Sequence, residues 1–108
     1  MTERAAALLH AFARSDLEAI AELCTEDVLL VGTDAGELWR GRETVVSAFA
    51  GAFDLSVEWV GDPTARDDWL FGDVVFGLPD GGRQAARVTM VFRDGLLAHA
   101  HYSVAARG

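Results

Sequence analysis

A chain of 108 residues, of which 51% are hydrophobic, can bury one core, which predicts a single domain over residues 1–108 and excludes a disordered protein. The formal net charge of -8 repels phosphate groups, so neither nucleic acid nor an anionic membrane is an expected partner. The sequence shows neither a signal-peptide pattern nor an apolar run long enough to span a membrane, and we expect a cytoplasmic protein.

Three segments in the first half of the chain are predicted to be helical. Apolar residues recur at helical spacing over residues 2–12, over 17–23 and over 42–53. Ser15 opens a capping-box pattern before the second of these segments. Cys24 continues the second apolar pattern, so we expect it to be an ordinary packing residue rather than a reactive thiol.

Strands are predicted on both sides of the third helix. Residues 28–31 form a short aliphatic run that ends in a glycine-containing turn. Four further strands separated by turn signals are expected over residues 55–60, 68–78, 84–93 and 96–105. Helices gathered before an antiparallel meander are typical of an α+β fold.

This order of elements resembles the SnoaL-like branch of the nuclear transport factor 2-like superfamily. The segments AFARSDLEAIAELCTEDV and DVLLVGTDAGELWRGRETV are similar to its helix pair and to its first strand, loop and third helix. HAHYS and the triplet Arg87-Val88-Thr89 are similar to its last two strands, although Gly95 stands where the family usually has Trp. The resemblance implies a cone-shaped fold with three N-terminal helices packed on a curved antiparallel sheet enclosing a pocket.

One candidate catalytic residue follows from this resemblance. Asp34 lies in the loop where the similar ketosteroid isomerases keep a proton-shuttling aspartate, and a carboxylate in an apolar pocket could act as a general base. The alternative is an ordinary turn-forming Asp. Leu8 stands at the position of the isomerases' oxyanion-binding tyrosine and cannot donate a hydrogen bond, which disfavours steroid isomerisation in that form.

Five further residues are candidate ligand contacts. Trp39 and Trp59 could form a pocket wall or ordinary core. His99 and His101 are two apart on one strand and therefore share a face, but no third ligand stands at a recognisable spacing, so we expect neither a metal nor a cofactor. A three-residue turn with a bulge at Gly95 would place Arg87 on that same face, whereas a two-residue turn would place it opposite.

Related domains line their cavity with the residue that matches Arg87, so the resemblance favours the three-residue turn and a pocket position for Arg87. The alternative is a surface Arg87 paired with an acidic residue. With Arg87 in the pocket, the apolar face that includes Val88, Met90 and Phe92 is expected to pair with a second copy, giving a homodimer through the outer face of the C-terminal strands. The leading hypothesis is a small-molecule-binding protein, and the sequence leaves open whether it is an enzyme. If it is one, the resemblance implies an isomerase, cyclase or hydrolase that acts by general acid–base chemistry on a small apolar or carboxylate-bearing substrate. The alternative is a non-catalytic association module.

Overall fold

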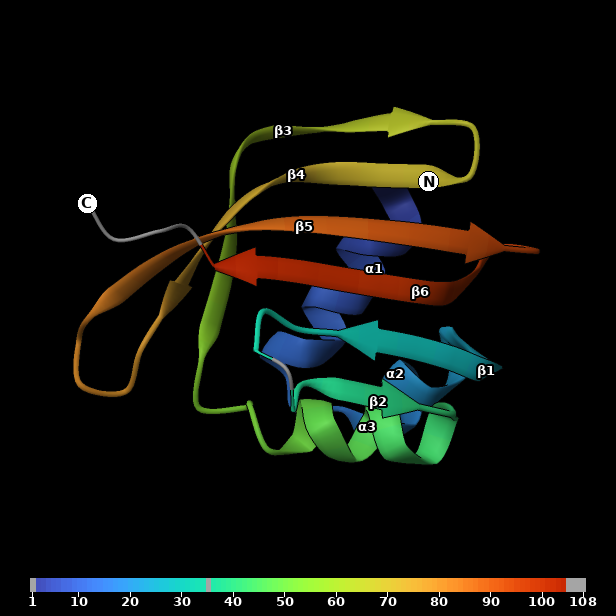
Figure 1. Cartoon of the computed structure of the whole chain (residues 1–108), viewed down its shortest axis with the longest axis horizontal. Helices are drawn as coiled ribbons and strands as arrows, with labels where there is room; N and C mark the ends of the chain where they lie inside the picture. The colour runs from blue at the N-terminus through green and yellow to red at the C-terminus, as the bar shows by residue number, and fades with distance from the viewer. Residues whose placement is uncertain (1, 35, 105–108) are drawn as a thin grey trace.

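The structure is a computed structural model that describes residues 2–34 and 36–104 (Figure 1). Within these ranges the chain forms three helices and one six-stranded sheet. In chain order the elements are α1 (Thr2–Ala13), α2 (Leu17–Glu22), β1 (Cys24–Val31), β2 (Leu38–Arg40), α3 (Arg42–Ala50), β3 (Ser56–Arg66), β4 (Trp69–Gly77), β5 (Arg83–Arg93) and β6 (Leu96–Val104). The expected α+β class is confirmed.

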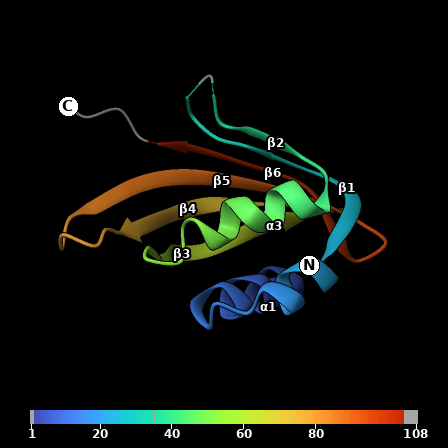
Figure 2. The same cartoon turned by 90° about the horizontal axis from the view of Figure 1, so that it is seen from below.

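The sheet is curved and mixed rather than wholly antiparallel. Its strand order is β2-β1-β6-β5-β4-β3, and β3 to β6 form the predicted antiparallel meander. The strand β1 lies beside β6, the last strand of the meander, and the two strands run parallel. The helices lie on one side of the sheet, where it is concave, and leave the other side uncovered by any described helix (Figure 2).

Several element boundaries differ from the sequence prediction. The N-cap of α2 is Asp16, whose carboxylate accepts the Ala19 N–H at 3.1 Å, while Ser15 adopts a φ of 56° in the preceding turn. Cys24 is the first residue of β1 and is fully buried, which raises the pKa of its thiol to about 11. No described helix is long and apolar enough to cross a membrane.

The hairpin between β5 and β6 decides which side chains share a face. Arg93 pairs with Leu96, so Asp94 and Gly95 form a two-residue turn, and their φ values of 54° and 80° are of the kind that such hairpins require. The pairing register then shifts, because Phe92 pairs with Leu97 but Val91 pairs with His99. The register shift has the same effect on side-chain direction as the bulged turn that was expected. Arg87 and His101 therefore do lie on one face of the sheet, although the turn itself has two residues.

The apolar face of β5 was expected on the outside of the sheet and the face with Arg87 in the pocket, but the structure shows the opposite. Val88, Met90 and Phe92 are buried beneath the helices together with Leu8 and Ile20. The expectation that this apolar face needs a second copy to cover it is therefore wrong, since α1 and α2 supply core residues against it.

Candidate functional site

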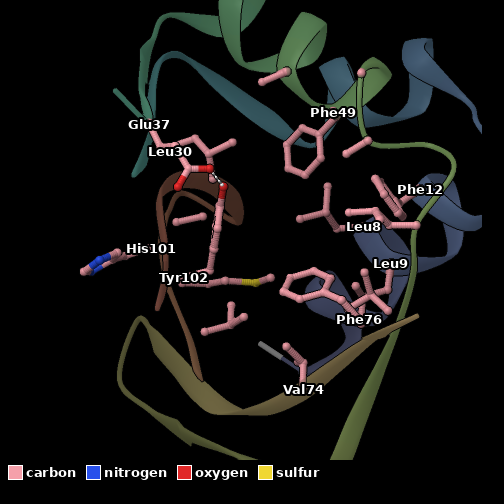
Figure 3. Close-up of a pocket in the computed structure, with 18 of the residues that line it drawn as sticks. Leu8, Leu9, Phe12, Leu30, Glu37, Phe49, Val74, Phe76, His101 and Tyr102 are labelled. Carbon is pink, nitrogen blue, oxygen red and sulfur yellow. Dashed lines mark hydrogen bonds between the residues drawn. The ribbon is translucent and has the colours of Figure 1, made fainter. Parts of the chain in front are cut away.

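An open cavity of about 630 Å³ lies between the concave face of the sheet and the helices (Figure 3). Its wall on the sheet side includes Val74 of β4, Met90 of β5 and Tyr102 of β6. On the helix side the wall includes Leu8 and Phe12 of α1. A cavity of this volume falls within the range of about 300–1,000 Å³ that is usual for small-molecule sites.

Aromatic packing holds the helix side of the cavity together. The Phe12 ring lies 6.0 Å from that of Phe49 in an edge-to-face arrangement and 5.4 Å from that of Phe53, measured between ring centroids. Phe76 approaches Tyr102 edge-to-face from β4, with the centroids 6.1 Å apart. Such edge-to-face contacts are favourable arrangements of aromatic rings, so Phe12, Phe49 and Phe76 form a packed aromatic part of the cavity wall.

A hydrogen-bonded acidic pair interrupts the apolar lining. The Tyr102 hydroxyl donates to Oε2 of Glu37 at 2.7 Å, and Oε1 of Glu37 accepts the backbone N–H of Asp34 at 2.8 Å. The Asp34 N–H and the Tyr102 hydroxyl hold the pKa of Glu37 below its ordinary value. Burial, and then the neighbouring Glu37 carboxylate, raise the pKa of Tyr102. At neutral pH Glu37 is therefore an anion and Tyr102 a neutral donor.

The loop between β1 and β2 brings this pair together. Gly32 lies so close that an added Cβ would be 2.6 Å from the Glu37 Cβ and 2.7 Å from the Tyr102 hydroxyl oxygen. Thr33 accepts the Val104 N–H on its hydroxyl oxygen at 2.7 Å, which fastens the loop to the end of β6. A residue larger than glycine at position 32 would push the loop, and Glu37 with it, away from Tyr102.

The pair can orient a ligand more readily than it can remove a proton from one. A lowered pKa makes Glu37 a weak base, and one of its oxygens already accepts a hydrogen bond from the Tyr102 hydroxyl. Among the described residues that line the cavity there is no arginine, so an anionic ligand would lack a guanidinium partner there.

The structure brings two of the sequence-predicted ligand residues to the cavity. Trp39 of β2 and Trp59 of β3 both line it, and both are half-buried. Trp39 reaches the inner side because it pairs with Leu30 of β1, which is buried beneath the helices. Each tryptophan also packs against the core, so both serve as pocket wall and as core, the two roles that the sequence left open.

Arg87, His99 and His101 are not gathered around the cavity. The side chain of Arg87 is 71% exposed on the opposite face and pairs with Asp73 at 3.1 Å, which is the surface ion pair considered as its alternative. His99 pairs in register with Val91 on that same outer face. His101 borders the cavity, but it is exposed and its imidazole points away from the other labelled side chains (Figure 3). No three potential metal ligands come together in the described part of the chain.

Asp34 also lies outside the cavity. Its side chain is exposed, and its carbonyl accepts the Glu37 N–H at 2.9 Å to close the turn. The structure therefore corrects the expected position of Asp34 in an apolar pocket, because the residue forms the turn and hydrogen-bonds to Glu37 through its backbone N–H and carbonyl.

Glu37 and Tyr102 were not among the predicted site residues. Tyr102 pairs in the sheet with Val88 and so belongs to the apolar face that the sequence analysis expected on the outside. Burial of the wholly apolar alternation on β5 was the signal that could have placed Tyr102 inward. Glu37 follows a turn and offers no comparable periodic signal.

The curved six-stranded sheet, with the three helices on its concave side, forms an α+β fold that borders the cavity. The family model of the SnoaL-like domain matches residues 5–100, and the chain belongs to this family. The recognition made from the sequence is thereby confirmed. No curated protein matches the chain in sequence.

Solved structures share the fold at low sequence identity. A nuclear transport factor 2-like protein of unknown function from Mesorhizobium loti is 18% identical, with a TM-score of 0.86 over 97% of this chain and 90% of that one. A presumed ketosteroid isomerase from Kribbella flavida is 19% identical, with a TM-score of 0.84 over 98% and 78%. A presumed polyketide cyclase from Sinorhizobium meliloti is 16% identical, with a TM-score of 0.80 over 93% of each chain. These similarities establish the fold alone.

Proposed function

We propose that this protein binds a small, largely apolar molecule in the cavity between its helices and its sheet. The observation that carries the proposal is an open space of about 630 Å³ whose apolar wall holds one hydrogen-bonded acidic pair. Apolar walls with a few fixed polar groups are typical of small-molecule sites, because the walls supply affinity and the polar groups orient the ligand. The open cavity supports this function over the alternative of a module whose cavity is filled by side chains.

The proposed chemistry, where the ligand is also a substrate, is acid–base catalysis of the isomerase, cyclase or hydrolase kind. Glu37 takes the role first considered for Asp34, and Tyr102 positions it through the 2.7 Å hydrogen bond. Because the pKa of Glu37 is lowered, this base suits only a relatively acidic substrate proton. Leu8 lines the cavity and offers no hydrogen bond, which still disfavours steroid isomerisation with a tyrosine at that position.

Binding can be tested with the neutral dye Nile red, whose fluorescence rises in apolar surroundings. Ala52 lines the cavity, so Ala52→Trp fills part of the space and is expected to abolish the signal. Ala13 is exposed at the end of α1, so Ala13→Trp is the matched control and keeps the signal. Dye at 100 times its dissociation constant adds about 2.7 kcal/mol of stability, which thermal unfolding detects. Equal dye binding by both variants, or none by the unmodified protein, contradicts the proposal.

We also propose a homodimer through the outer face of the C-terminal strands, with corrected contact residues. On that face Val91 and Thr89 of β5 pair with Trp69 and Phe71 of β4, which are 52% and 40% exposed. Large aromatic side chains left in water favour association. A two-fold pairing of sheets is the common solution for a small protein.

A further inference from the structure

We infer that the cavity selects lipophilic ligands with a hydrogen-bond donor or a positive charge, such as alcohols and amines, and discriminates against carboxylates. The inference rests on the proposed function and assigns the ligand class of that same site. It replaces the carboxylate-bearing substrate suggested by the sequence, because Arg87, the cation on which that suggestion depended, lies on the outer face.

The charges around the cavity favour a cation over an anion. Glu37 is the single acidic residue among the described residues that line it, and none of them is arginine. The sequence has no lysine, and the imidazole of His101 points away from the cavity (Figure 3). A ligand carboxylate would thus meet Glu37 with no lining guanidinium to offset the repulsion. An ammonium group would meet an unlike charge, and the net charge of -8 adds attraction at long range.

The hydrogen bonds of Glu37 also favour a donor. A carboxylate presents about four lone-pair directions, and those of Glu37 already accept the Tyr102 hydroxyl and the Asp34 N–H, with a weaker contribution from the Thr33 N–H. Accepting capacity therefore remains for a ligand O–H or N–H. A ligand that only accepts cannot pair with Glu37, because an ionised carboxylate has no hydrogen to donate.

The walls facing the pair are suited to an apolar ring system. Phe12, Phe49 and Phe76 lie across the cavity from Glu37 (Figure 3). These rings can hold the body of a ligand while its head group reaches the carboxylate. Affinity then comes mainly from the walls, and the choice of head group comes from Glu37.

The test uses three probes with one ring system, namely 2-naphthylmethylamine, 2-naphthalenemethanol and 2-naphthoate. At pH 7 calorimetry is expected to show the amine binding at least about tenfold tighter than the carboxylate, with the alcohol between them. Tenfold corresponds to about 1.4 kcal/mol, near the lower limit for a hydrogen bond to a charged group.

Glu37→Gln removes the charge but keeps an oxygen that can accept from Tyr102, and it is expected to bring the amine and carboxylate affinities within about threefold of each other. Glu58→Gln makes the same change on an exposed strand position outside the cavity and leaves the preference intact. The three-probe comparison on the unmodified protein decides the inference even if Glu37→Gln does not fold.

Three outcomes overturn the inference: equal affinities in the unmodified protein, a preference for the carboxylate, or an amine preference that survives in folded Glu37→Gln. If the alcohol and Nile red still bind in those cases, the proposed function stands and only the ligand class is wrong. If neither the alcohol nor the dye binds, the proposed function fails and this inference fails with it.

Discussion

Replacing Gly32 with alanine tests the site through a single methyl group. The added Cβ would lie 2.6 Å from the Glu37 Cβ and 2.7 Å from the Tyr102 hydroxyl oxygen, well inside van der Waals contact. Both neighbours belong to the acidic pair, so relief of the clash requires them to separate. The variant is therefore expected to break the 2.7 Å hydrogen bond between Tyr102 and Glu37.

The expected cost is about 3 kcal/mol. Forcing a methyl group into a packed site costs roughly 1–3 kcal/mol. Losing a hydrogen bond to a charged group costs about 1.5–3 kcal/mol, and the two costs overlap because movement that breaks the bond also relieves the clash. A loss of this size lowers the melting temperature of a domain of this length by roughly 10–20 °C.

Thermal unfolding measures the first effect, with Gly36→Ala as the control. Gly36 is exposed in the same loop and an added Cβ there meets no atom within 4 Å, so that variant should stay within about 0.5 kcal/mol of the unmodified protein. A second readout comes from Tyr102, the one tyrosine in the sequence, whose ultraviolet titration reports its pKa directly.

In the unmodified protein the Tyr102 hydroxyl should titrate above its ordinary pKa of 10.0, because of burial and the nearby Glu37 carboxylate. Gly32→Ala should move that pKa back toward 10.0. The reasoning is refuted if Gly32→Ala has the same melting temperature as Gly36→Ala and leaves the pKa of Tyr102 unchanged. The close approach at Gly32 would then not hold Glu37 and Tyr102 together.

Three further predictions concern charge and assembly. Arg87→Leu should leave the affinity for cavity ligands unchanged in calorimetry and alter stability by about 1 kcal/mol at most, because its ion pair is exposed; a selective loss of anionic ligands would return Arg87 to the site. The pKa of Glu37 is lower in the folded chain than its ordinary 4.5, so its stabilising effect is present above pH 4.5 and disappears as the pH falls through the folded value. Acid melts should thus destabilise the unmodified protein more than Glu37→Gln, and parallel curves would contradict this. Phe71→Glu should convert the proposed dimer to monomer in light scattering, whereas Thr44→Glu on an exposed helix position should not; a monomeric unmodified protein at micromolar concentration would exclude the dimer.

The helices and the meander could be predicted because periodicity and turn residues are local signals. Apolar spacing identified α1, and the Asp94-Gly95 pair marked the turn between β5 and β6. The strand β2 was missed because three residues are too few to show alternation. The parallel contact between β1 and β6 joins distant parts of the chain, so no local pattern reports it.

The candidate site was predicted less well because the faces of β5 were assigned by analogy rather than by burial. Val88 and its apolar neighbours on alternate positions could cover a core, whereas a face containing Arg87 could not do so without a buried partner for the charge. Applying that criterion would have turned Tyr102 inward and the histidines outward. The position of Glu37 at the cavity still could not be predicted, because it depends on the contact between its loop and β6, which are far apart in the sequence.

Because side chains alternate along a strand, β6 separates the two proposed roles of the protein. Tyr102 points to the helix side and serves the cavity, while its neighbour His101 is exposed on the face proposed for dimerisation. A change confined to the outer face, such as Phe71→Glu, leaves the Tyr102 and Glu37 contact untouched. Ligand binding and association can therefore be removed one at a time. A monomeric variant that still binds the neutral dye would show that the cavity is complete within one chain, whereas loss of both would mean that the second copy helps to hold the sheet in its curved form.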